Sequence, residues 1–413
     1  MRFILTPVGS EGDLYPFVAL ALLLKQRGHE VLLVHGEHFI DHLKEVDVPK
    51  KPLGSSELYL KMARNPDLWH PIKSLEVLGR SLGIGLEDFF KALIGEVKRS
   101  PCILISPTLG PAARIIQDLL GTKTLTVHLQ PAAMPTVYEM PELSIGPWIK
   151  RAPKIVKSAL YKIAAVVSDR SFGPPVNTLR KKLGLKPVEN ILLGWMNSPD
   201  GVLCLFPSWY GPKQPDWPVP LAHATFPVFD RSDVNAYNAE VESFFAEHRP
   251  IVVTHGTANF TASKFFEDSV LALIRSDRPA ALLTREREQL PKYLPENIRH
   301  FTFLPFSKVL PMSSGIVHHG GMGTTVQALR AGCPQLIVPM AHDQFDNGAR
   351  ITRMGAGKSC PIRKYSSSTL SAWLDLVNSG SFREGAAVAA SKVNQEQFHI
   401  AVVKAFGELG LTI

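Results

Sequence analysis

The 413-residue sequence predicts an α/β protein of two Rossmann-like domains, whose parallel sheets face each other across a cleft. Short, continuous apolar runs, typical of strands buried on both faces, alternate with helical patterns. This alternation occurs twice, once on each side of a proline-rich stretch. We place the domains at 1–225 and 226–393, followed by a C-terminal helical segment at 394–413.

The first forty residues have a β-α-β pattern. A strand is predicted at 3–6, and Pro16 is predicted to open a helix that Gly28 ends. The apolar side chains of this helix recur at i, i+3, i+4 and i+7, namely Phe17, Leu20, Ala21 and Leu24. Further buried strands are predicted at 31–34, 103–105 and 125–127.

Six prolines lie between Pro207 and Pro227, and we predict an ordered crossing there rather than a helix or strand. The second domain then contains five runs that predict strands: 251–254, 281–283, 301–303, 316–318 and 336–338. A last helix is predicted at 395–409.

Composition limits the class of protein. Hydrophobic residues make up 45% and charged residues 20%, which indicates a globular chain. The longest apolar run has eight residues, Phe17–Leu24, too few to span a bilayer, and the N-terminal stretch is too short for a signal-peptide core. Four scattered cysteines exclude a disulfide scaffold, so we expect a cytoplasmic protein. The net charge of +8 suits an anionic ligand or a membrane surface, and no nucleic-acid module is present.

The strongest motif runs from His318 to Thr325, directly after a predicted strand and before a predicted helix. Its three glycines allow a ligand to approach the backbone, and a helix N-terminus offers unpaired N–H groups. His319, Thr324 and Thr325 add side-chain donors. The pattern predicts a diphosphate site, and the alternative is a tight strand–helix turn without a ligand. A dinucleotide fingerprint fits poorly, and the P-loop lysine is absent.

Asp343 and Gln344 follow the next predicted strand. A carboxylate beside an amide at the C-terminal end of a strand suits vicinal sugar hydroxyls. The alternative is that Asp343 caps a helix starting near Phe345.

Two segments resemble a known family. The stretch from Val317 to Asn347 resembles the donor signature of GT-B glycosyltransferases of family 1, the UDP-glycosyltransferase-like enzymes. The stretch from Gly9 to Phe17 resembles their acceptor-lobe opening. The prolines and tryptophans between Pro207 and Pro218 look closest to the bacterial rhamnolipid-type rhamnosyltransferases, beside the sterol- and antibiotic-modifying enzymes.

The resemblance implies a GT-B fold with an acceptor-binding first domain, a donor-binding second domain and a last helix packed on the first domain. It implies donor contacts from these residues: Gly12, Gly256, Thr257, His319, Gly320, Gly321, Gly323, Thr324, Gln327, Asp343 and Gln344. Gln327 stands where many relatives carry a ribose-binding glutamate. The segment 303–306 stands where plant members stack a tryptophan on the base, and this chain has no tryptophan there.

Inverting sugar transfer needs a base for the proton of the acceptor hydroxyl. Asp13 lies in a predicted glycine-flanked loop after the first strand, and relatives that modify sterols and antibiotics similarly carry an aspartate there. The alternative is a helix cap, and Glu11 is the second candidate base. No Asp-x-Asp pair is present, so we expect transfer without a metal and with no resident cofactor.

Two further features concern the acceptor. The segment 148–170 is basic and amphipathic, so it is either a membrane-surface helix on the inner face of the membrane or a solvated helix of the acceptor lobe. His128, at the end of a predicted strand, is a candidate acceptor-binding residue or a satisfied buried histidine.

These features predict an inverting transferase that moves a hexose from a UDP-glucose or dTDP-rhamnose type donor to a hydroxyl of a hydrophobic small molecule or lipid. The alternatives are a nucleotide-sugar epimerase or hydrolase of the same fold, or a non-catalytic nucleotide-sugar-binding auxiliary protein. A nicotinamide oxidoreductase is disfavoured by the missing fingerprint.

Overall fold

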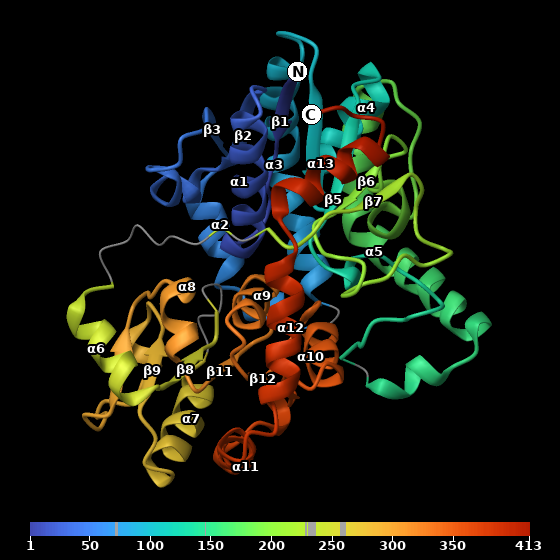
Figure 1. The fold of residues 1–413 in the computed structure, drawn as a ribbon. Coiled ribbons are helices and arrows are strands. Elements are labelled where there is room, and N and C mark those ends of the chain that lie inside the picture. Colours follow the sequence, from blue (N-terminus) through green and yellow to red (C-terminus); the bar gives the residue numbers. More distant parts are fainter. Residues whose placement is uncertain (71–72, 145, 228, 230–236, 257–261) are drawn as a thin grey trace. The chain divides into compact units, whose positions relative to one another are not determined.

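The computed structural model describes residues 1–70, 73–144, 146–227, 229, 237–256 and 262–413, which form two compact units (Figure 1). The first unit comprises Met1–Pro141, Ile145–Phe229 and Gln397–Ile413. The second comprises Glu142–Ser144 and Asp230–Glu396. Within the described residues, no helix combines the length and hydropathy needed to cross a bilayer.

The first unit is built on a parallel seven-stranded sheet with the order β3-β2-β1-β4-β5-β6-β7. Its strands are β1 (Arg2–Leu5), β2 (Glu30–Gly36), β3 (Lys50–Leu53), β4 (Ile103–Pro107), β5 (Thr124–His128), β6 (Val202–Cys204) and β7 (Leu221–His223). Its helices are α1 (Glu11–Gln26), α2 (Ser56–Ala63), α3 (Lys73–Val97), α4 (Pro111–Leu120), α5 (Lys154–Lys182) and α13 (Phe398–Glu408).

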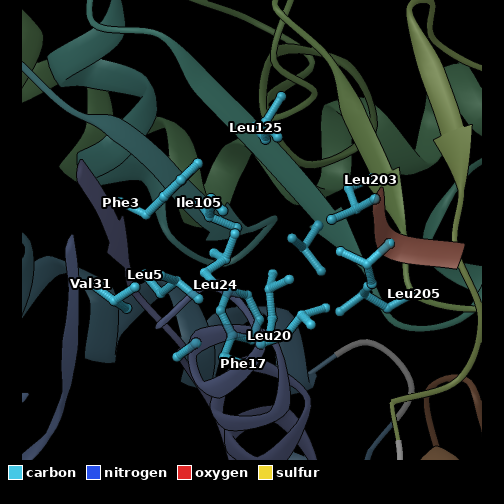
Figure 2. Close-up of a cluster of buried hydrophobic side chains, with 14 of the residues drawn as sticks. Phe3, Leu5, Phe17, Leu20, Leu24, Val31, Ile105, Leu125, Leu203 and Leu205 are labelled. Atoms are coloured by element: carbon cyan, nitrogen blue, oxygen red, sulfur yellow. The ribbon is translucent and has the colours of Figure 1, made fainter. Parts of the chain in front are cut away.

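One core of this unit lies between the sheet and α1. Figure 2 shows Phe3, Leu5 and Ile105 of the strands close to Phe17 and Leu20 of α1. All five side chains are fully buried, as the helical spacing of the apolar residues predicts. The C-terminal helix α13 adds its own buried residues to the same core.

Helix α1 begins at Glu11, so the prediction that Pro16 opens it is wrong. Ser10 is the N-cap residue, and its backbone N–H donates to Oδ2 of Asp13 over 2.8 Å. This capping interaction starts the helix one turn earlier than the proline pattern suggests. Asp13 therefore lies in the first turn of α1 rather than in a loop.

The second unit is built on a parallel six-stranded sheet with the order β10-β9-β8-β11-β12-β13. Its strands are β8 (Ile251–Thr254), β9 (Ala280–Leu283), β10 (Ile298–Phe301), β11 (Gly315–His318), β12 (Gln335–Ile337) and β13 (Gly357–Ser359). Its helices are α6 (Ala239–His248), α7 (Ser263–Arg275), α8 (Phe306–Val309), α9 (Met322–Arg330), α10 (Gln344–Arg353), α11 (Ser367–Asn378) and α12 (Arg383–Gln395).

Three predicted segments differ from the structure. The proline-rich stretch contains a strand, β7, at the edge of the first sheet. An edge strand has a neighbouring strand on one side only, so a proline, which lacks a backbone N–H, can be accommodated there without loss of a hydrogen bond between strands. Strand β10 ends at Phe301, where the predicted strand 301–303 was to begin. The last helix begins at Phe398, because α12 runs on to Gln395.

Candidate functional site

The first half of the glycine-rich turn is held by His318. This side chain is fully buried at the end of β11, and its Nδ1 accepts the N–H of Gly320 over 3.2 Å. Its Nε2 therefore carries the proton and donates to Oε1 of Gln335 over 2.9 Å. Burial and the neighbouring His319 lower the pKa of His318 to about 3, so the ring is a neutral structural group.

Gly320 can only be glycine here. Its φ is +93°, and an added Cβ would come within 2.6 Å of Cγ2 of Ile337. Its N–H is bonded to His318, and its carbonyl accepts Nδ2 of Asn347 over 2.9 Å. Gly320 therefore shapes the turn, and both of its backbone polar groups already have protein partners.

His319 occupies a slot between two glycines. A Cβ on Gly256 would come within 2.6 Å of Cε1 of His319, and a Cβ on Gly321 within 2.5 Å of its Nε2. Burial lowers the pKa of His319 to about 4, so the ring is neutral near pH 7. Its Nδ1 is buried and has no hydrogen-bond partner among the described residues. A buried polar atom normally has a hydrogen-bond partner. This nitrogen is therefore suited to donate a hydrogen bond to an anionic ligand.

The N-terminus of α9 follows directly. Gly321 is its N-cap residue, and its carbonyl accepts the first helical bond, from the N–H of Thr325 over 3.0 Å. The geometry of a helix leaves the N–H groups of the preceding three residues, 322–324, without helical acceptors. The Thr325 hydroxyl also donates to Gly321, so the expectation that it serves a ligand is wrong, whereas Thr324 is partly exposed.

Gly323 and Gln327 lie on the same helix. Gly323 is exposed, and nothing lies within 4 Å of where its Cβ would be. Gln327 is half-buried. Thr257, another expected donor contact, lies outside the described residues.

Asp343 and Gln344 begin the next helix, α10. Asp343 is its N-cap residue but makes no capping bond, and its Oδ2 accepts Nδ2 of Asn347 over 2.7 Å. Oε1 of Gln344 accepts the backbone N–H groups of Met340 and Ala341, over 2.8 Å and 3.1 Å, which fixes the orientation of this side chain. The fully buried Asn347 thus links the glycine turn to the Asp343 carboxylate, a link that sequence reasoning missed.

Asp13 belongs to the first unit. Both the N–H and the hydroxyl of Ser10 donate to its Oδ2, over 2.8 Å and 3.0 Å. Burial raises the pKa of the Asp13 carboxyl above its ordinary value, and the two bonds from Ser10 act in the opposite direction. A capping role is therefore real, and it coexists with a carboxylate that is more basic than an exposed aspartate. Gly12, beside it, is exposed.

The second candidate base, Glu11, already has a side-chain partner. Its Oε1 lies 3.0 Å from Nε2 of His42. Near it, the ring of His38 stacks on Tyr59 with the centroids 3.5 Å apart, and burial lowers the pKa of His38 to about 4. Sequence reasoning missed both histidines, because they lie in short 3-10 turns without a regular pattern.

His128 lies at the end of β5 and is 1% exposed. Its Nε2 is bonded to Oδ1 of Asn197 over 2.8 Å, and burial lowers its pKa to about 4. Its Nδ1 has no partner in the described part of the chain. Only a group that reaches the interior of the unit would meet this lone pair, and acceptor binding by His128 stays a prediction.

Among the described residues, no three side chains of His, Cys, Asp or Glu lie together as a metal-binding group. The rings of His318 and His319 are nearly perpendicular, at 88°.

Two family models match the chain, one in each part. Residues 3–104 match the glycosyltransferase family 28 N-terminal domain, and residues 278–409 match the C-terminal domain of erythromycin biosynthesis protein CIII-like proteins. A sterol 3-beta-glucosyltransferase of Arabidopsis thaliana is 28% identical over 90% of this chain, which spans 62% of that protein. The glycosyltransferase GtfE of Amycolatopsis orientalis is 26% identical over 86% of this chain and 85% of its own length.

Solved structures share the fold. The kitacinnamycin glycosyltransferase superposes with a TM-score of 0.73 at 16% identity, covering 99% of this chain and 98% of its own. The glycosyltransferase VinC, solved with dTDP, gives a TM-score of 0.66 at 19% identity over 99% of this chain and all of its own. The chain belongs to the GT-B glycosyltransferases of family 1 and is related to the sterol glucosyltransferases and antibiotic glycosyltransferases.

Proposed function

We propose that this protein transfers a hexose from a nucleoside-diphosphate sugar of the UDP-glucose or dTDP-rhamnose type to a hydroxyl of a hydrophobic small molecule or lipid, with inversion and without a metal. The observation that carries the proposal is the buried Nδ1 of His319 at the N-terminus of α9, which has no hydrogen-bond partner in the part of the chain that the structure describes. The names of the relatives support the reaction class, and their acceptors, sterols and antibiotic aglycones, support a hydrophobic acceptor.

The diphosphate would lie at the start of α9. Its oxygens would accept the N–H groups of residues 322–324 and the Thr324 hydroxyl, with the positive end of the helix dipole behind them. Because His319 is neutral, it would contribute a hydrogen bond rather than a full charge. Gly256, and Thr257 in the segment outside the described residues, would complete this face, and Gln327 would reach the ribose.

The sugar would be held by Asp343 and Gln344. The Asp343 carboxylate accepts hydrogen bonds from sugar hydroxyls, while Nε2 of Gln344 donates one. Since Asn347 fixes the Asp343 carboxylate, its direction is set before the sugar binds.

Asp13 would act as the base. The acceptor oxygen attacks the anomeric carbon and its proton passes to Asp13, while the bond from that carbon to the diphosphate oxygen breaks and its electron pair stays on the leaving nucleotide. Attack from the face opposite the leaving group inverts the anomeric centre. The raised pKa of Asp13 makes it a better proton acceptor than an exposed aspartate.

The direct test is nucleotide binding by titration calorimetry, with UDP and dTDP each measured against the wild type and His319→Ala. We expect one of the two nucleotides to bind, and the substitution to weaken binding at least tenfold. The exposed His248→Ala on α6 serves as the matched control and should bind like the wild type. Lack of binding by both nucleotides would contradict the proposal. Release of free sugar at full rate without an acceptor would indicate a hydrolase.

Metal independence has its own test. Sugar transfer should survive a chelator at the wild-type rate. Loss of activity that a divalent ion restores would overturn this part of the mechanism.

A further inference from the structure

The first half of α5 and the preceding turn, η5 (Pro147–Arg151), carry a concentration of exposed apolar side chains. Of the seventeen large apolar side chains exposed in the described part of the chain, six lie between Tyr138 and Val166. Ile155 is 79% exposed, Trp148 61%, Ile163 60% and Val166 57%. In Figure 1 this segment leads away from the seven-stranded sheet of its unit.

The structure fixes which side of α5 faces outward. Lys157 is buried and its Nζ donates to the carbonyl of Val137, and the Tyr161 hydroxyl donates to the carbonyl of Thr136. These two residues are one turn apart and hold the inner side of the helix against residues 136–137. The apolar stripe lies on the opposite side, at i, i+4, i+8 and i+11, and consists of Ile155, Ala159, Ile163 and Val166.

The charge of this segment has a single sign. From residue 145 to 168 the sequence contains five basic and no acidic residues. Lys157 is turned inward, so it does not belong to the solvated lysine face that the sequence pattern indicates. The exposed cations around the stripe are Arg151, Lys154 and Lys162. Lys154 lies toward the inner side of the helix, with its Nζ 3.8 Å from the ring centre of Tyr138.

We propose that this surface, the α5 stripe with Trp148 and its flanking cations, binds the surface of a bilayer that contains anionic lipids. The aliphatic side chains of the stripe suit the acyl-chain layer of a bilayer, and Trp148 suits the interface above it. The basic side chains around the stripe suit the phosphate headgroups. An anionic surface also complements the three exposed cations, Arg151, Lys154 and Lys162, in a stretch whose sequence contains no acidic residue. The inference goes beyond the proposed reaction and does not depend on it.

The experiment is co-sedimentation of the full chain with vesicles of phosphatidylcholine, alone or with about 30% phosphatidylglycerol. We expect binding to the anionic vesicles, weaker binding to the neutral ones, and loss of the difference at high salt. The apolar variant is Ile155→Ser/Ile163→Ser/Val166→Ser, and the charge variant is Arg151→Glu/Lys154→Glu/Lys162→Glu. Each should weaken partitioning on the order of 100-fold.

Matched controls use residues of the same kinds that are exposed elsewhere in the first unit. They are Ile84→Ser/Leu120→Ser/Ile400→Ser for the apolar variant and Lys61→Glu/Lys98→Glu/Lys181→Glu for the charge variant. Both controls should bind like the wild type. Wild-type protein that stays in the supernatant, or controls that lose binding as the test variants do, would overturn the proposal. So would a concentration-dependent dimer that the apolar variant dissociates, because a second copy would then cover the stripe.

Nucleotide calorimetry on the same variants keeps this test apart from the proposed reaction. The affinity for UDP or dTDP should not change, since α5 holds none of the expected donor contacts. A variant that loses vesicle binding and keeps nucleotide binding has lost only the membrane surface.

Discussion

Asp13→Asn paired with Ser10→Ala separates the two roles of Asp13, the helix cap seen in the structure and the proposed base. The carboxylate receives the N–H and the hydroxyl of Ser10 at the start of α1, so its removal could act through the helix rather than through the proton. An asparagine oxygen still accepts both bonds but has almost no basicity. Ser10→Ala instead removes the hydroxyl bond and keeps the carboxylate.

The two variants should have similar stability. Ser10→Ala loses one N-cap side chain, which typically costs about 1 kcal/mol. Asp13→Asn exchanges charge-assisted bonds for neutral ones near a helix N-terminus, a change of about 1 kcal/mol as well. Urea unfolding of both proteins measures these costs.

Their rates of sugar transfer should differ strongly. A general base contributes about 10²–10⁴-fold, so we expect Asp13→Asn to lose at least 100-fold in kcat and Ser10→Ala less than tenfold. In addition, the Ser10 hydroxyl lowers the pKa of Asp13, so its removal should move the acid limb of the pH–rate profile to higher pH. If Ser10→Ala loses as much activity as Asp13→Asn, the carboxylate acts by holding the helix and the assignment as a base fails.

Three further predictions concern the second unit and the buried histidines. Gly323→Ala should leave the melting temperature unchanged or raise it, because its Cβ meets nothing within 4 Å, yet weaken nucleotide binding about tenfold by calorimetry; unchanged affinity would place the diphosphate elsewhere. Asn347→Ala should cost about 1–3 kcal/mol in urea unfolding, because it leaves the buried Gly320 carbonyl without its donor. The control Asn394→Ala, which loses an exposed bond to the Arg330 carbonyl, should cost less than 1 kcal/mol, and equal costs would contradict the argument. Burial lowers the pKa of His128 and His319 to about 4 and of His255 and His318 to about 3, from 6.5. The unfolded chain therefore takes up protons below pH 6.5 that the folded chain refuses, and stability should fall as pH drops from 6.5 toward 4, by up to about 1.4 kcal/mol per pH unit for each histidine; a flat stability profile over this range would refute it.

The sequence predicts the interior strands far better than the edges. The interior strands of both sheets, such as β1 and β8, are buried on both faces and therefore appear as continuous apolar runs. Of these, only the three-residue β6 was missed. All four edge strands were missed or misplaced, namely β3, β7, β10 and β13.

The edge strands are difficult for a physical reason. Strand β3 has the sequence Lys-Lys-Pro-Leu and β13 has Gly-Lys-Ser, and neither shows an apolar run. An edge strand pairs on one side only, so polar residues and prolines are tolerated there and can even protect the edge. Their positions are fixed by the register with the neighbouring strand, which is not visible in a local pattern.

The site shows the same division between local and long-range information. The glycine turn and the Asp343–Gln344 pair carry local motifs that predict their place at strand ends. By contrast, no role for Asn347 was predicted, because that role depends on a bond to Gly320, 27 residues away. The slot for His319 depends on Gly256, which comes from another strand end.

The hydrogen bonds of the turn separate the residues that build it from those that face a ligand. His318, Thr325 and Asn347 have specific protein partners at the turn and set its shape. The buried Nδ1 of His319 has none among the described residues, and helix geometry leaves the N–H groups of 322–324 without helical acceptors. The pKa values of these two adjacent histidines are both lowered, to about 3 for His318 and about 4 for His319, but their hydrogen bonding differs. Both ring nitrogens of His318 have protein partners, whereas the buried Nδ1 of His319 has none among the described residues and in the proposed function would donate to the diphosphate. Such a site gains binding energy from satisfying groups that were already dehydrated and fixed in place, which is the condition under which few hydrogen bonds hold a diphosphate firmly.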